Sequence, residues 1–68
     1  MQYVMIIERG EQNFSAYFPD LPGCIATGKT REELKQRMRE ALELHLRGMR
    51  EDGLPLPEPS LVDYIEAA

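Results

Sequence analysis

Few side chains in this 68-residue chain could do chemistry, and they are scattered. The chain has one histidine, His45, and one cysteine, Cys24. A general base or a metal ligand needs companion groups, and the sequence places none around His45. Cys24 follows a turn, with no second histidine or helix start immediately behind it to lower the pKa of its thiol. We expect a partly buried, hydrogen-bonded His45, a structural thiol at Cys24, and neither a metal site nor a cofactor.

The carboxylates offer one enzymatic alternative. Metal-dependent phosphodiester hydrolysis uses clustered acids to hold two ions about 4 Å apart. Glu8, Glu40 and Asp63 could supply them from a first strand, a helix and a last strand. Against this, Glu8 ends its strand and Glu40 points away from the apolar face of its helix. We predict that the chain is not an enzyme, and a metal-dependent nuclease stays the less favoured alternative.

A basic stripe is the one feature that favours nucleic acid. Arg31, Lys35 and Arg39 follow one another at four-residue spacing, but no aromatic residues interleave and no second helix forms a helix-turn-helix. The net charge is −4, and residues 52–68 contain four acids and no base. Such a protein is a poor general binder of nucleic acid and a plausible partner for a basic protein. We expect a solvated helix face and no direct DNA binding.

The same composition bounds the setting of the protein. The longest apolar run, residues 3–7, is far shorter than the roughly 20 residues of a membrane span, and no charged-then-apolar leader precedes it. A single cysteine excludes a disulfide within the chain. We expect a soluble, cytoplasmic protein without a membrane partner.

The first half of the chain predicts three strands. Residues 2–8 (QYVMIIE) are apolar on both parities, which is typical of a central strand covered on both faces. Residues 14–18 (FSAYF) alternate with the period of a half-buried strand, so the two form a hairpin across residues 9–13. Pro22-Gly23 suits the middle of a type II turn. A third strand then covers residues 24–26 and ends at Thr27-Gly28.

The second half predicts one helix. Residues 30–33 (TREE) match the capping box, in which Thr30 accepts from the amide of Glu33 and the glutamate reaches back. Glu33 with Arg37 and Glu43 with Arg47 are favourable pairs four residues apart. Asp52-Gly53 ends the helix. Its predicted apolar face comprises Leu34, Met38, Ala41, Leu42, His45 and Met49.

Proline stands at every second position of residues 54–60 (LPLPEPS), so this segment is an extended spacer. Residues 61–66 (LVDYIE) predict a last strand. A helix between two strands of one sheet makes a right-handed crossover, which sets the last strand parallel to the first. The prediction is a single α+β domain, residues 1–68, with β-β-β-α-β order: a small mixed sheet of three antiparallel strands plus a fourth parallel to strand one, with the helix on one face. Strand one is predicted to be apolar on the other face as well, so we expect a second subunit or another partner to cover it. We therefore expect a homo-oligomer, either a dimer or a tetramer.

Three features in order resemble the HicB antitoxin family over residues 3–66. They are the stretch YFPDLPGC at residues 17–24 with Thr27-Gly28 after it, the capping box continuing into Leu34, and the sequence LPLP at residues 54–57. The resemblance implies a partial ribonuclease-H-like fold without nuclease activity of its own. It also implies an antitoxin that neutralises a small basic HicA-type toxin, an endoribonuclease acting on messenger RNA.

Carried over by position, the resemblance makes Tyr17, Phe18, Asp20 and Leu21 candidate partner contacts. Family members commonly have a DNA-binding domain after the last strand that represses their own operon, whereas this sequence stops at Ala68, so the resemblance does not carry autorepression over to this chain. The family tends to have alanine where Leu34 stands. The alternative function is an orphan oligomeric adaptor or ligand-binding domain with no toxin.

Overall fold

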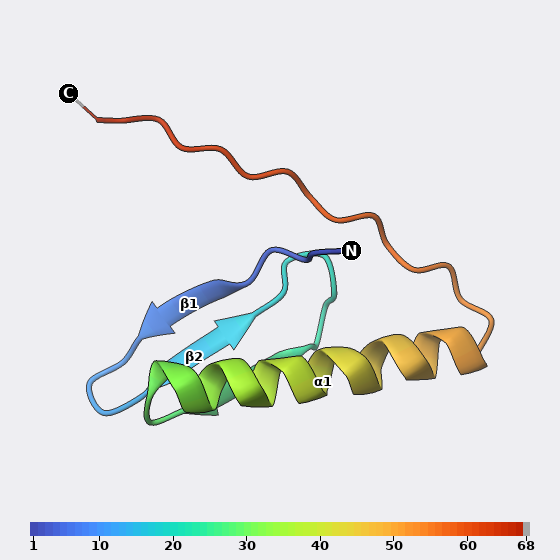
Figure 1. The fold of residues 1–68 in the computed structure, drawn as a ribbon, viewed down its shortest axis with the longest axis horizontal. Helices are drawn as coiled ribbons and strands as arrows, with labels where there is room; N and C mark the ends of the chain where they lie inside the picture. The colour runs from blue at the N-terminus through green and yellow to red at the C-terminus, as the bar shows by residue number, and fades with distance from the viewer. Residues whose placement is uncertain (68) are drawn as a thin grey trace.

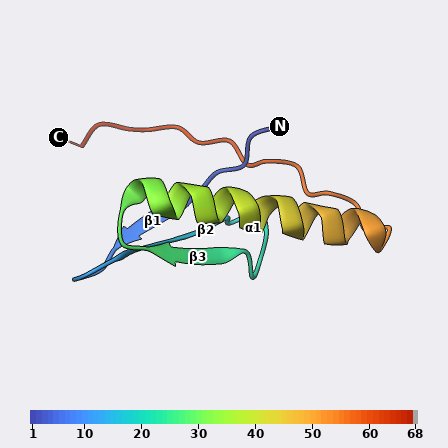
Figure 2. The same cartoon turned by 60° about the horizontal axis from the view of Figure 1, so that its bottom comes forward.

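The computed structural model describes residues 1–67 as a three-stranded antiparallel sheet with one helix across it (Figures 1 and 2). The strands β1 (Ile6–Arg9), β2 (Phe14–Tyr17) and β3 (Ile25–Gly28) lie in the order β1-β2-β3. The helix α1 (Arg31–Glu51) follows directly, and residues 54–67 form neither helix nor strand. Ala68, the last residue of the predicted domain, lies outside the described residues.

The predicted hairpin of the first two strands is confirmed, with its alternation. Ala16 pairs with Ile7 on one side and Ala26 on the other, while Tyr17 pairs with Ile6 and Ile25. Successive side chains of a strand point to opposite faces. Ala16 is therefore buried towards the helix, and Tyr17 lies on the face that the helix does not cover.

The corner between β2 and β3 is held by its own backbone. The Cys24 amide donates to the Leu21 carbonyl (3.1 Å) across Pro22-Gly23, and Gly23 has φ +86°. A positive φ at the third residue is the mark of the predicted type II turn. The Leu21 amide donates to the Phe18 carbonyl (3.0 Å), and the Phe18 amide donates to the Cys24 carbonyl (3.3 Å). These bonds fold the corner inward, so that Leu21 is buried.

The helix begins and ends where the sequence predicts. Thr30 Oγ1 accepts from the Glu33 amide (3.1 Å). The return half of the capping box is wrong, because the Glu33 carboxylate pairs with Arg37 (3.0 Å) instead. At the other end Gly53 has φ +70°, and its amide and that of Leu54 donate to the carbonyls of Arg50 and Met49. This pattern is a Schellman cap.

Of the two predicted ion pairs on the helix, that of Glu33 with Arg37 is confirmed. Arg37 also donates to the Thr27 carbonyl (2.9 Å), which ties α1 to β3. Glu43 and Arg47 form no ion pair in the described structure, where both side chains are exposed. Holding two long exposed side chains together costs about as much entropy as the pair gains.

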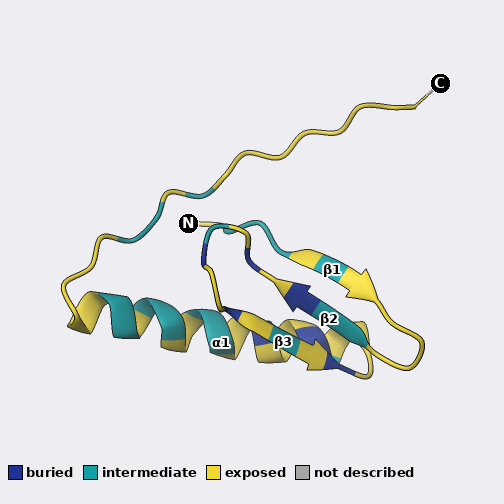
Figure 3. Ribbon diagram, turned by 180° about the vertical axis from the view of Figure 1, so that it is seen from behind, coloured by how far each residue is buried: buried dark blue, intermediate teal, exposed yellow. Residues whose placement is uncertain are grey.

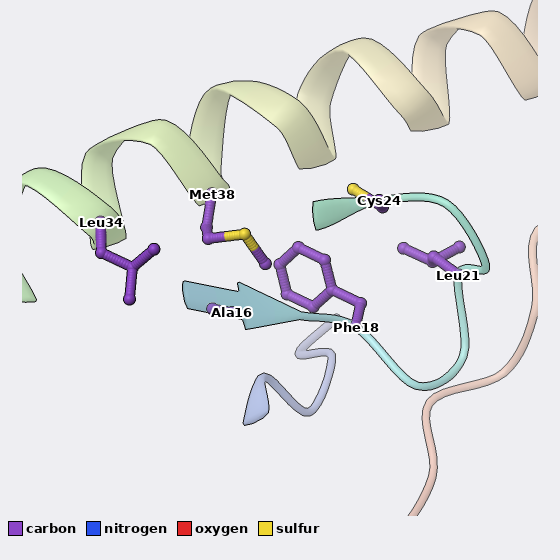
Figure 4. Close-up of a cluster of buried hydrophobic side chains, with 6 residues drawn as sticks. All are labelled: Ala16, Phe18, Leu21, Cys24, Leu34 and Met38. Atoms are coloured by element: carbon purple, nitrogen blue, oxygen red, sulfur yellow. The ribbon is translucent and has the colours of Figure 1, made fainter. Parts of the chain in front are cut away.

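The core lies between the helix, the strands β2 and β3, and the corner that joins them (Figure 4). Leu34 and Met38 come from the predicted apolar face of α1, and the rest of that face, His45 included, is half-buried. The helix packs on β3 and β2 but does not reach β1. The buried residues are Ala16, Phe18, Leu21, Cys24, Leu34 and Met38.

Two predictions about the sheet are wrong. Strand β1 is shorter than residues 2–8 and lies at the edge, not at the centre. Within the described residues there is no fourth strand: residues 61–66 are extended but exposed, and they pair with nothing (Figure 3). The α+β class stands with three strands. The two errors have one cause, because β1 could be central only if the last segment lay beside it.

Candidate partner-binding surface

The face of the sheet opposite the helix presents one continuous apolar row. Ile6, Tyr17 and Ile25 are cross-strand neighbours through the register of both strand pairs. Their exposed fractions are 37%, 36% and 67%. We call this set the apolar row. It crosses every strand of the sheet, and the described part of the chain does not cover it.

Polar side chains border the apolar row. Glu8, Ser15 and Thr27 form the next row across the same face. A shallow depression of about 300 Å³ lies over β2 and β3, with Tyr17 and Ile25 on its apolar side. An exposed apolar strip with a polar rim is typical of a surface that binds another protein.

The structure separates the four predicted contact residues. Tyr17 lies in the middle of the apolar row, whereas Phe18 and Leu21 are buried in the core below the corner. Phe18 and Leu21 are therefore core residues whose side chains the chain itself already covers. Partner contact by any of the four remains a prediction.

Asp20 is engaged within the chain. Its carboxylate accepts hydrogen bonds from the Ser60 hydroxyl (2.6 Å) and the Ser60 amide (2.8 Å). The hydroxyl bond first, and then the amide bond, lower the pKa of Asp20 below its ordinary value, because both favour the ionised carboxylate. Nearby, the Tyr3 hydroxyl donates to the Pro57 carbonyl (2.6 Å). Together these contacts hold the proline segment, residues 54–60, against the corner and the start of the chain.

The sequence did not predict this role of Asp20. An acid between two prolines marks a rigid corner, but its partner stands 40 residues further along the chain. The only local signal is a serine at the point where the proline alternation stops. A serine hydroxyl and amide can bind many acceptors, so that signal does not single out Asp20.

The enzymatic alternative gains no support from the geometry. Glu8, Glu40 and Asp63 come from β1, α1 and residues 61–66, and all three are exposed. Among residues 1–67 no three histidine, cysteine or acidic side chains gather as a metal site would require. Cys24 is buried, and burial raises the pKa of its thiol.

The remaining chemical candidates lie at the surface. Arg31, Lys35 and Arg39 are exposed along α1, as the prediction of a solvated face requires. His45 is half-buried and lines a shallow depression of about 260 Å³ beside Ile25 and Leu44. No described helix has the length and apolar character to cross a membrane.

Comparison with known proteins shows which family this chain is similar to. The model of the family described as "HicB_like antitoxin of bacterial toxin-antitoxin system" matches residues 3–68. A 14.9 kDa protein from the rep-hol intergenic region of Haemophilus phage HP1 is 33% identical over 93% of this chain and 47% of its own length. A UPF0150 protein of Helicobacter pylori is 39% identical over 72% of this chain and 68% of its own length.

A solved structure agrees with these relatives. A chain of the HicA3 and HicB3 toxin-antitoxin complex superposes with a TM-score of 0.68 at 32% sequence identity. The match covers 82% of this chain and 65% of that chain. This chain thus spans about half of the phage relative and just under two thirds of the solved one.

Proposed function

This chain belongs to the HicB-like antitoxin family, and on that premise we propose that it binds and neutralises a small basic toxin of the HicA type. The likeness to a chain of a HicA3 and HicB3 complex is the observation on which the proposal depends. The family points to a role without catalysis by this chain. A cytoplasmic setting and a partial ribonuclease-H-like fold belong to the same proposal.

The surface of the molecule supports a protein partner. The apolar row gives a partner a dry centre, and aromatic residues such as Tyr17 are enriched among the residues that dominate binding energy. The acidic balance of the chain, −4, attracts a basic partner and speeds its association. We propose that the toxin docks on the open face of the sheet, with Tyr17 at the centre and Ile25 beside it.

Neutralisation then requires only that this chain occupy the surface with which the toxin binds RNA. An inhibitor that covers the substrate-binding surface of a ribonuclease stops catalysis without chemistry of its own, provided that the complex outlasts the encounter with RNA. The chain contributes a rigid platform, since the Phe18 amide donates to the Cys24 carbonyl and so closes the corner directly after Tyr17. Rigid platforms bind well because little conformational entropy is lost.

The test is co-expression with a small basic protein encoded beside this chain. We expect growth to be restored and the two proteins to purify together. Tyr17→Lys and Ile25→Lys should each weaken the complex by roughly 30-fold, about 2 kcal/mol, because each places a charge like that of the partner in the apolar row. Gln12→Lys makes the same charge change in the exposed hairpin turn and should bind normally.

Two outcomes would count against the proposal. If the toxin stays lethal beside the wild-type chain, the antitoxin function is wrong and the orphan adaptor gains. If the complex forms but both row variants bind as tightly as Gln12→Lys, the toxin docks elsewhere. Circular dichroism of each variant checks that the fold survives.

A further inference from the structure

The end of the chain exposes side chains that a strand normally covers. Leu61 and Ile65 are 100% and 96% exposed, and Tyr64 is 89% exposed. Val62 between them is also exposed. In an extended chain successive side chains alternate, so residues 61–66, which we call the terminal segment, carry apolar groups on both faces. That pattern fits a strand with neighbours above and below it, not a solvated tail.

Strand β1 lacks a neighbouring strand on its outer side in the described structure, and α1 does not reach over it. The chain leading into it is also apolar on both faces, with Met5 and Ile7 towards the core and Val4 and Ile6 on the other side. A free edge with apolar flanks is a template for a further strand.

The proline segment delivers the terminal segment to the right place. The bonds from Tyr3 to Pro57 and from Ser60 to Asp20 fix its end beside the start of the chain. Residues 59–62 and residues 2–4 line one shallow depression there. Beyond Ser60 the terminal segment runs in the same general direction as β1 but diverges from it (Figures 1 and 2). It starts next to the residues that lead into its own β1, and it does not pair with that strand.

We propose that two copies of this chain exchange their terminal segments, so that residues 61–66 of each add a strand to the β1 edge of the other. A single chain that holds the segment so close to its own edge still leaves it exposed, which favours a second copy as the occupant. A two-fold axis makes the contact reciprocal. It seats the four exposed apolar side chains of each copy and leaves neither β1 edge open.

This dimer does not depend on the proposed toxin. The terminal segment adds at the edge of the sheet, whereas the apolar row lies on its open face. The chain could form this dimer without binding a toxin, or bind a toxin without forming this dimer, and separate measurements would distinguish the two cases. The dimer can therefore be tested with this chain in the absence of any toxin.

The first experiment measures mass by light scattering across a dilution series. The wild-type chain should have about twice its 7.8 kDa mass. Proline has no amide to donate, and successive amides of a strand point to opposite sides. Either Asp63→Pro or Tyr64→Pro must therefore remove a hydrogen bond to β1. We expect that variant to raise the dissociation constant of the dimer at least tenfold. Ala67→Pro, just past the apolar stretch, is the control and should stay dimeric.

The second experiment separates exchange from closure within one chain. One chain carries Glu8→Cys on β1 and another carries Glu66→Cys at the end of the terminal segment; both positions are exposed. Co-expressed and treated with a short bis-maleimide, they should give a cross-linked heterodimer. The wild-type chain, whose only thiol is the buried Cys24, controls for other links.

Either experiment can overturn the proposal. A wild-type chain that is monomeric throughout, or a dimer that neither proline variant weakens, excludes strand addition between copies. A third variant carries both Glu8→Cys and Glu66→Cys. If the link forms within this variant's monomer and never between the two single variants, the segment closes on its own β1.

Discussion

At the residue scale, Asp20 joins two parts of the chain that the sequence keeps far apart. Its carboxylate receives both hydrogen bonds that Ser60 can donate, and these lower its pKa below the ordinary value of 3.8. A carboxylate with a depressed pKa in the folded state contributes stability above its unfolded pKa. That contribution is lost as the pH falls through the folded pKa.

We therefore predict that acid releases the Ser60 end of the proline segment from the corner. The Ser60 amide resonance should shift with a midpoint below pH 3.8 in an NMR titration of the full chain. Asp20→Asn keeps an oxygen acceptor but cannot ionise, so its Ser60 resonance should not titrate. A Ser60 midpoint at or above 3.8 in the wild-type chain would contradict the contact.

At this scale the sequence could predict only those residue positions that depend on local pattern. Tyr17 was predicted as a contact and lies in the exposed row. Phe18 shares the parity of Phe14 and Ala16, so the alternation itself predicts a buried side chain at that position. Leu21 is different, because only the hydrogen-bonded corner turns its side chain inward. Asp20 could not be paired with Ser60 by any local rule.

At the element scale, the helix ends and the turns followed from the sequence because their interactions stay within a few residues. The Thr30 cap, the turn at Gly23 and the Schellman cap at Gly53 each close over at most six residues. The prediction of a last strand at residues 61–66 was wrong because a strand depends on contacts with distant parts of the chain or with another chain. A strand exists only with a neighbour, and neighbours are set by the assembly, not by propensity.

The glycines give a test of how tightly the helix meets the sheet. A Cβ added at Gly28 would lie 2.8 Å from the Leu34 amide nitrogen, whereas one added at Gly48 would meet nothing within 4 Å. We predict that Gly28→Ala destabilises the chain by about 2 kcal/mol, because backbone atoms cannot move aside without opening the β3 to α1 contact. Gly48→Ala should stabilise it by about 0.8 kcal/mol through helix propensity.

Urea unfolding followed by circular dichroism measures both changes. Since each variant adds the same methyl group, Gly48→Ala is the matched control for Gly28→Ala. Equal effects of the two substitutions would mean that the end of β3 does not press against the helix. The midpoints are compared at one protein concentration, so that the concentration-dependent contribution of self-association is the same for each variant.

At the scale of the whole molecule, a thin two-layer body explains why so much apolar surface is left over. A chain of this length buries only about 60% of the surface that its unfolded form exposes. One helix covers β2 and β3, and β1 with the terminal segment remains outside that cover. Self-association and a protein partner would fill different parts of this deficit, the sheet edge and the open face.

If the chain exchanges its terminal segments, its melting temperature must depend on concentration. Unfolding of a dimer releases two chains, so a tenfold increase in concentration stabilises each chain by about 0.7 kcal/mol. For a domain of this size that corresponds to about 3–6 °C in melting temperature. The proline variant that breaks the exchange should melt at a lower temperature with a slope near zero, while Ala67→Pro should keep the wild-type slope. Scanning calorimetry over a hundredfold concentration range measures all three, and a flat wild-type line would mean that the terminal segment is not exchanged between copies.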